Sequence, residues 1–284
     1  MYKKNYNNRD KSFSKRGRDE YKKRERAPYQ DAREDDSEGV TSNAVGGRNA
    51  VLELLKSGRD IDKLFVRKGD REGSITLIVA EAIKRGIPVI EVEKTKIDVL
   101  GGGVNHQGVV AMAAAKEYVS VDDILDIAKE RGEKPLIVIA DEIADPHNLG
   151  AIIRCAEGAG AHGLIIPKRR SSGLTAVVEK SSAGALEHLA IAKVPNLAAA
   201  IDDLKEKGIW VYGAEADGAS YYDTKFDSAT AIVVGSEGEG ISRLIREKCD
   251  FMISIPMYGK VNSFNVSCAT AVILCEAARQ MRGK

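Results

Sequence analysis

Apolar and amphipathic stretches alternate along the chain from about residue 45, and they fall into two blocks. In the first block, helical spacing of apolar residues alternates with short strand-like runs. The predicted helices cover residues 46–58, 74–86 and 94–102, and the predicted strands cover residues 61–68, 87–93 and 107–114. Because each element must bury its apolar side, this block predicts a small α/β domain over residues 44–115.

A polar stretch at residues 116–120 predicts a linker, and the alternation then resumes over residues 121–284. The predicted strands cover residues 135–143, 162–167, 186–194, 209–216, 230–237 and 250–257. The predicted helices cover residues 121–132, 148–160, 174–185, 196–208, 240–249 and 263–282. Residues 135–143 form a continuous apolar run closed by carboxylates, which is typical of a strand buried on both faces. This block therefore predicts an open parallel sheet with helices between its strands.

The composition fits two aliphatic domains and no membrane segment. A chain of 284 residues suggests about two domains. Hydrophobic residues make up 43% of it and aromatic residues only 5%, so we expect cores of Val, Ile, Leu and Ala. No apolar run approaches the ~20 residues that cross a bilayer, and the N-terminus lacks the apolar segment of a secretory signal. We expect a cytoplasmic protein.

The first 43 residues differ from the rest in charge and in apolar content. Residues 1–30 hold eleven Lys and Arg against four Asp and Glu, and residues 31–39 are acidic. Few branched aliphatic residues occur here, so we expect a disordered basic arm. Such an arm adds non-specific attraction to a phosphate backbone; the alternative is a solvated tail without a function.

The four cysteines give no sign of a metal site or of disulfides. They form no C-x-x-C motif and have no histidine nearby at metal-ligand spacing. Cys268 and Cys275 lie seven residues apart in an apolar helical pattern, so we expect buried thiols in the core.

Unusual residues crowd the loops after three predicted strands, which is where ligands bind in open parallel sheets. The first loop, DPHNLGAIIRC, has Asn148 as a candidate helix N-cap, and Arg154 in an otherwise apolar helical stretch. The second, GSEGEGIS, contains Glu237 among glycines that let the backbone approach a ligand closely. The third, IPMYGKVNSFNVS, holds Ser263 and Asn265, and it has more amide and hydroxyl groups than a helix cap requires. Each loop alone also fits a structural role: a snorkelling arginine, a glycine turn, a cap.

A match to the dinucleotide-binding motif is rejected on its context. The letters GAGAHG at residues 158–163 fit G-x-G-x-x-G, but they follow a predicted helix and precede a predicted strand. We therefore expect a helix end and a loop there, and not a nicotinamide site. Of the histidines, His147 flanks the first loop and is placed to contact RNA, whereas His106, His162 and His188 are expected to be structural.

Taken together, the three loops resemble the three signature motifs of the SpoU/TrmH family of RNA ribose 2′-O-methyltransferases. N-x-G-x-x-x-R is met at residues 148–154, a strand followed by G-x-E-x-x-G at residues 230–240, and I-P-M-x-G followed by S-x-N-V-S at residues 255–267. Order and spacing agree, and the likeness covers about residues 121–284. One departure is Phe264, where the family usually has leucine. The first domain is similar to the substrate-binding domain of these enzymes, which resembles ribosomal protein L30e.

The resemblance implies a SPOUT fold, which is a parallel sheet ending in a C-terminal trefoil knot, and a homodimer with its active site between subunits. It implies S-adenosylmethionine (SAM) as cofactor and RNA as substrate, with no metal and no membrane. The segments GRNAVLELL and NHQGVVA resemble those of the subgroup that methylates a guanosine of 23S (large-subunit) rRNA. The RNA partner that this implies is 23S rRNA or a ribosomal assembly intermediate. The same chemistry on tRNA or at another rRNA nucleotide, and a catalytically silent RNA-binding protein, are the alternatives.

The resemblance also assigns roles to residues. Arg154 is expected to orient the 2′-hydroxyl and to stabilise its developing negative charge, since an arginine side chain stays protonated and is a poor base. Asn148 and Glu237 are expected to position Arg154 or the substrate. Ser263 and Asn265 are expected to hold the target nucleotide. Backbone groups near four residues are expected to bind SAM, namely Gly213, Gly235, Ile255 and Phe264.

Overall fold

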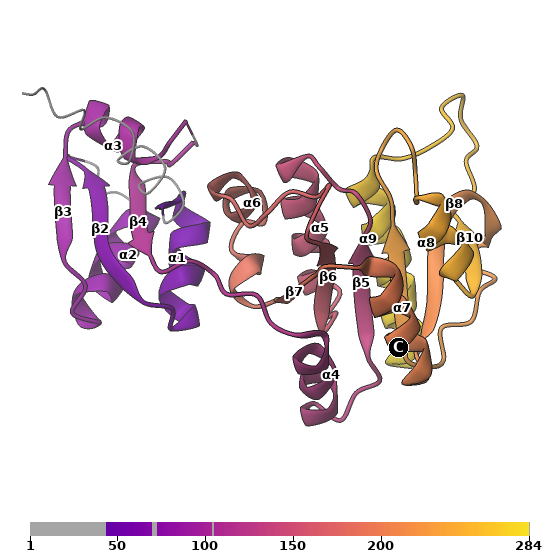
Figure 1. Cartoon of the computed structure of the whole chain (residues 1–284). Coiled ribbons are helices and arrows are strands. Elements are labelled where there is room, and N and C mark those ends of the chain that lie inside the picture. The colour runs from indigo at the N-terminus through magenta and orange to yellow at the C-terminus, as the bar shows by residue number, and fades with distance from the viewer. Residues whose placement is uncertain (1–43, 70–72, 104, 284) are drawn as a thin grey trace, which may run out of the picture. The chain divides into compact units, whose positions relative to one another are not determined.

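The computed structural model describes residues 44–69, 73–103 and 105–283 (Figure 1). The expectations of a disordered arm and of its attraction to RNA fall on residues 1–43 and lie outside this part of the chain. Within the described residues, no helix combines the length and the apolar character needed to span a bilayer.

The first sheet has four strands in the order β1-β4-β2-β3. The strands are β1 (Ala44–Gly46), β2 (Ile61–Arg67), β3 (Val89–Val92) and β4 (Val109–Ala113), and the helices are α1 (Arg48–Ser57), α2 (Ser74–Lys84) and α3 (Lys94–Leu100). Strand β2 pairs parallel to β3 and antiparallel to β4. The apolar sides of α1 and α2 pack together with β2 and β4 in one core, and Ile97 of α3 lies in a second, smaller core. All six predicted elements are confirmed, whereas β1 is too short to show an alternation in the sequence.

The second sheet has six strands in the order β10-β8-β9-β5-β6-β7, and every pair is parallel. The strands are β5 (Leu136–Ala140), β6 (Gly163–Pro167), β7 (Ala190–Val194), β8 (Trp210–Ser220), β9 (Thr230–Val234) and β10 (Phe251–Ser254). The expected parallel sheet is thus confirmed. The strand order does not trace the threading of the C-terminal segment, so the trefoil knot stays a prediction.

Helices cover both faces of this sheet (Figure 1). The helices are α4 (Val121–Glu130), α5 (Pro146–Gly158), α6 (Ala176–Ser181), α7 (Leu197–Glu206), α8 (Arg243–Lys248) and α9 (Val266–Met281). One core joins α5, α6 and α9, and the other joins α4, α7 and α8. In β5, Val138 lies in the first core, and Ile137 and Ile139 lie in the second. Successive side chains of a strand point to opposite faces, which explains why β5 is apolar throughout.

Helix α5 begins two residues earlier than expected, and the prediction of Asn148 as its N-cap is wrong. The N-cap is Asp145, whose carboxylate accepts a hydrogen bond from the backbone N–H of His147 at 3.0 Å. Pro146 takes the first helical position, where its missing N–H costs nothing. Asn148 therefore lies inside the first turn, and its side chain is available for another role.

Gly150 of α5 serves packing between helices. A Cβ atom at this position would lie 2.5 Å from Cβ of Ser181 and 2.8 Å from the carbonyl oxygen of Val178. Helices α5 and α6 approach so closely that only glycine fits here.

The expectation of buried thiols is wrong for two cysteines. Cys268 and Cys275 are both exposed: their seven-residue spacing places them on one side of α9, and that side faces outward. Cys249 is half-buried, and burial raises the pKa of its thiol to about 12. Cys249 therefore behaves as an unreactive packing residue.

The glycine-rich segment 158–163 lies between a helix and a strand, as the sequence predicted. Helix α5 ends at Gly158, and β6 begins at Gly163. His162 between them is buried, accepts a hydrogen bond from the backbone N–H of Leu136 at 3.0 Å, and contacts Glu133 at 3.1 Å. This segment is the end of a helix and not a dinucleotide site.

A buried charge cluster surrounds Arg59, in the loop before β2. Its guanidinium donates to Glu187 at 2.8 Å and to Glu179 at 2.9 Å. Burial raises the pKa of the Glu179 carboxyl to about 7, although Arg59 opposes that shift. Burial also lowers the pKa of Lys116, whose ammonium donates to the carbonyl oxygen of Glu187. One guanidinium therefore pairs with two carboxylates in a buried position.

The raised pKa of Glu179 predicts a pH-dependent stability. The folded state binds this proton more tightly than the unfolded chain, so its contribution is complete at low pH and is lost as pH rises through about 7. Glutamine imitates the protonated carboxyl. We expect the thermal midpoint of Glu179→Gln, relative to the wild type, to rise between about pH 5 and about pH 8. Differential scanning calorimetry measures this, and a pH-independent difference would contradict it.

Candidate functional site

The three loops singled out in the sequence follow strands that lie near one another in the parallel sheet. The first follows β5, the second follows β9 and the third follows β10, in a sheet that runs β10-β8-β9-β5. Because all these strands are parallel, their carboxyl ends meet at the same edge.

The side chain of Asn265 joins the three loops. Its amide nitrogen donates a hydrogen bond to Oδ1 of Asn148 at 3.0 Å and a second to Oε1 of Glu237. Its Oδ1 accepts from the backbone N–H of Ser267 at 2.9 Å and from the Ser267 hydroxyl at 2.6 Å. Asn265 is thus the N-cap of α9 and, at the same time, the link between the first and second loops.

The hydrogen-bonding capacity of Asn265 is filled by these contacts. An amide side chain offers two N–H donors and one carbonyl acceptor, and all of them have partners. In this arrangement Asn265 fixes the side chains of Asn148 and Glu237. Ser263, in contrast, is exposed and lines the adjacent pocket.

The glycine loop after β9 is closed on itself. The backbone N–H of Ser236 donates to the carbonyl of Gly240 at 3.0 Å, and the N–H of Gly240 donates back at 3.0 Å. A Cβ at Gly235 would lie 2.1 Å from the carbonyl carbon and oxygen of Gly240. The close approach of the two backbone segments therefore requires glycine at position 235.

Two carboxylates that the sequence analysis did not single out hold the end of this loop. Glu215 accepts from the backbone N–H of Ile241 at 2.6 Å, and the buried Asp141 accepts from the N–H of Ser242 at 2.7 Å. Asp141 directly follows β5, so its position at a strand end was a usable signal. Glu215 lies inside the long strand β8, where nothing in the sequence marks it.

A pocket of about 390 Å³ lies beside the glycine loop. Three of the four expected cofactor residues line it, namely Gly235, Ile255 and Phe264. Gly213 does not, although the next residue, Ala214, does. A Cβ at Gly213 would lie 2.8 Å from the Cε atom of Met252, so this glycine permits close packing against β10.

The lining of this pocket fits SAM in its chemistry. Ile253, Val266 and Ile273 add apolar wall to Ile255 and Phe264, which suits a purine ring. Glu215, Glu237 and Glu239 bring carboxylates, which suit a ligand that carries a sulfonium and an ammonium group. The volume is within the range of about 300–1,000 Å³ of small-molecule sites. The described residues contain no group of His, Cys, Asp and Glu that could hold a metal.

Arg154 lies apart from this pocket. It is exposed on α5 and makes no hydrogen bond or ion pair with the residues that the structure describes. Neither Arg154 nor Asn148 lines the pocket. Of the five expected catalytic residues, the structure joins Asn148, Glu237 and Asn265, places Ser263 beside them, and leaves Arg154 facing outward.

Comparison with known families agrees with this site. Residues 135–275 match the SpoU rRNA Methylase family, which includes all three loops. Residues 44–119 match the family described as RNA 2′-O ribose methyltransferase substrate binding. The two matches correspond to the two sheets of the structure.

Relatives align over most of the chain. A protein of Bacillus subtilis named as a TrmH family tRNA/rRNA methyltransferase is 45% identical over 83% of this chain and 95% of its own length. One of Staphylococcus haemolyticus with the same name is 46% identical over the same shares. The crystal structure of the SpoU methyltransferase AviRb of Streptomyces viridochromogenes, in complex with AdoMet (SAM), is 25% identical and covers 85% of this chain and 91% of that one, with a TM-score of 0.70. The chain therefore belongs to the SpoU/TrmH family of RNA methyltransferases.

Proposed function

We propose that the chain transfers a methyl group from SAM to the 2′-hydroxyl of a ribose in RNA. The observation that carries this proposal is the junction at Asn265, which joins Asn148 to Glu237 next to a pocket suited to SAM. SAM supplies an activated methyl group, whose bond to sulfur breaks as its bond to the ribose oxygen forms. The task of the protein is then to align the hydroxyl with that methyl group and to stabilise the charge that develops on the oxygen.

We propose that Arg154 stabilises the charge on the ribose oxygen, and that it does so in the active site of a second subunit. Its side chain is exposed and does not line the pocket of its own chain. In a homodimer with its active site between subunits, Arg154 reaches the ribose bound beside the partner's pocket. Its guanidinium donates hydrogen bonds to the 2′-oxygen as the proton leaves that oxygen for solvent or a nearby phosphate.

The outer side of α9 supports the proposed homodimer. Cys268 and Cys275 are exposed there, and Ala271 and Val272 between them are half-buried. Small apolar side chains on the outer side of a helix allow close packing against the same helix of a second subunit.

The proposed target is a guanosine of 23S rRNA, in a protein that works in the cytoplasm. The support is the likeness of GRNAVLELL and NHQGVVA to the subgroup with that activity. The names of the relatives allow both tRNA and rRNA, so the test must include both.

Incubation with methyl-labelled SAM tests the proposal. We expect label in an unmodified 23S rRNA transcript and little in unmodified tRNA. The labelled nucleotide should resist alkaline cleavage on its 3′ side, because that cleavage requires a free 2′-hydroxyl, and mass spectrometry should identify it as 2′-O-methylguanosine. Label on a base would contradict the proposed chemistry, and label in tRNA alone would contradict the proposed target.

A further inference from the structure

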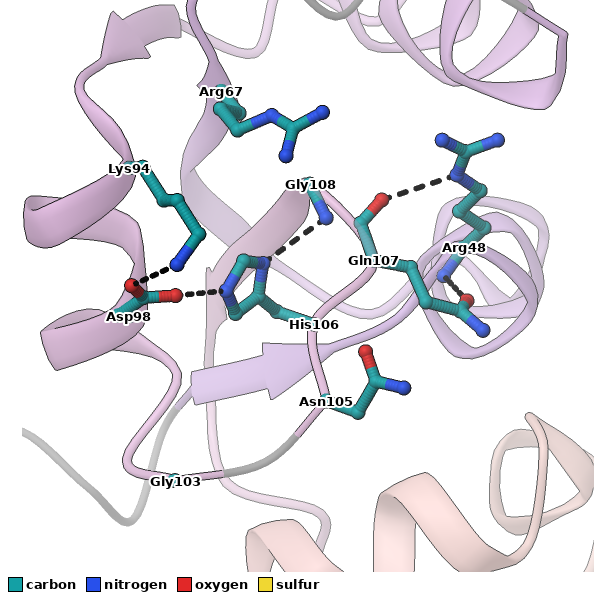
Figure 2. Close-up of a pocket in the computed structure, with 9 residues that line it drawn as sticks. All are labelled: Arg48, Arg67, Lys94, Asp98, Gly103, Asn105, His106, Gln107 and Gly108. Atoms are coloured by element: carbon teal, nitrogen blue, oxygen red, sulfur yellow. Dashed lines mark hydrogen bonds and ion pairs between the residues drawn. The ribbon is translucent and has the colours of Figure 1, made fainter.

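The two segments that suggested the subgroup, GRNAVLELL and NHQGVVA, meet in the structure of the first domain. The backbone N–H of Arg48, at the start of α1, donates to Oε1 of Gln107 at 3.0 Å. The Arg48 side chain donates through Nε to the carbonyl oxygen of Gln107 at 3.1 Å (Figure 2). One residue of the first segment thus holds both the side chain and the backbone of one residue of the second.

His106 braces the same loop from its other side. The backbone N–H of Gly108 donates to Nδ1 at 3.0 Å, so Nδ1 is an acceptor and carries no proton. Nε2 therefore carries the proton and donates to Oδ1 of Asp98 at 2.8 Å. In this arrangement His106 is neutral and positions the loop, and it is not a cationic ligand.

Gln107 has an unusual backbone conformation for its residue type. Its φ is 51°, in the left-handed region that favours glycine. The bonds to Arg48 offset the cost of this conformation. Glycine would adopt this conformation more easily, but it would lose the bond from the Arg48 N–H to the Gln107 side chain, so glutamine fixes the position of the loop.

The braced loop forms one wall of a pocket of about 610 Å³ (Figure 2). Arg48 comes from α1, Arg67 from the end of β2 and Lys94 from the start of α3. Among the nine described residues that line the pocket, Asp98 is the one carboxylate, and it contacts Lys94 at 3.1 Å as well as His106. The lining also includes the amides of Asn105 and Gln107. The described lining therefore combines three cationic side chains with amides that can hydrogen-bond to the edge of a base.

We propose that this pocket binds one nucleotide of single-stranded RNA, with its phosphate at Lys94 and Arg67 and its base near Asn105 and Gln107. A phosphate is the anion that arginine and lysine together recognise. Amide side chains pair with base edges, and single-stranded nucleotides present those edges freely. The inference rests on the proposed function for the identity of RNA as ligand, and it adds the place and the residues of contact.

A pair of lysines on α3 provides the test. Lys94 lines the pocket, whereas Lys96 is exposed on the same helix and does not. Lys94→Gln and Lys96→Gln remove the same charge from the same element. We expect Lys94→Gln to weaken binding to the 23S rRNA transcript several-fold and to reduce the slope of log K against log salt by about 1. Lys96→Gln should change both much less.

Asp98 provides a variant with the opposite effect. Asp98→Asn removes the negative charge but keeps an oxygen that accepts from His106. We expect it to tighten RNA binding and to steepen the salt dependence. A variant that binds more tightly cannot owe its effect to loss of folding.

Turnover separates this inference from the proposed function. All three variants should keep the wild-type kcat at saturating RNA, with the change confined to KM. If the wild type methylates no RNA, the proposed function fails. If it methylates RNA and Lys94→Gln behaves like Lys96→Gln, or Asp98→Asn does not tighten binding, the pocket does not bind the nucleotide.

Discussion

Replacement of Arg154 with alanine is expected to reduce methyl transfer to a small residual rate and to leave SAM binding intact. Arg154 is exposed and does not line the SAM pocket, so its loss removes no hydrogen bond or ion pair among the described residues of the subunit. The loss of one donor to a developing oxyanion lowers kcat about 10²–10³-fold. Single-turnover kinetics and calorimetric titration with SAM measure the two quantities separately.

Replacement of Arg154 with lysine distinguishes the effect of the positive charge from the effect of the planar guanidinium. Arg154→Lys keeps the positive charge but lacks the planar set of donors, so we expect it to recover only part of the lost rate. Near-normal turnover by Arg154→Ala would remove this residue from the mechanism.

Replacement of Gly235 with alanine is expected to abolish SAM binding. The new Cβ would meet the backbone of Gly240 at 2.1 Å, and a backbone contact cannot be relieved by a rotamer change. The glycine loop must open, and it lines the pocket. We expect the Kd for SAM to rise at least about 100-fold, which corresponds to about 3 kcal/mol.

Gly238 supplies the matched control within the same loop. Gly238 also lines the pocket, but a Cβ there would meet nothing within 4 Å, so Gly238→Ala should leave the loop closed and weaken SAM binding much less than Gly235→Ala. Equal Kd values for Gly235→Ala and Gly238→Ala would show that the close approach at Gly235 is irrelevant to the pocket.

The two inactive variants together test whether the site is shared. In a mixed dimer, a subunit with Arg154→Ala keeps its SAM pocket, and a subunit with Gly235→Ala keeps its arginine. Co-expression should therefore restore part of the activity if Arg154 serves the pocket of its partner. If both elements act within one chain, the mixture stays inactive.

The sequence predicted the residues of the site better than the helix boundary and the contacts that position them. Asn148, Glu237 and Asn265 were recognised by the order and spacing of their motifs, and the structure joins these three side chains. The start of α5 was misjudged because Asp145 and Pro146 together make a stronger helix start than the asparagine that follows them.

Other features depend on contacts that a linear pattern does not contain. Apolar spacing indicated that α9 packs against a core, but it did not show which side faces outward, so Cys268 and Cys275 were placed wrongly. Arg59 and Glu179 are 120 residues apart, and neither stands in an unusual stretch. Their pairing follows from the packing of α6 and has no local signature.

The pairing of β5 with β9 has a consequence for the way in which the chain becomes folded. Leu136 lies opposite Thr230, and the strands between them in sequence occupy other places in the sheet. During synthesis, β5 can pair with β6 soon after both strands have emerged, but its other edge must wait for β9 and one of its faces must wait for α9. Since such distant pairings slow folding, one edge of this central strand stays unpaired until most of the methyltransferase sheet has been made.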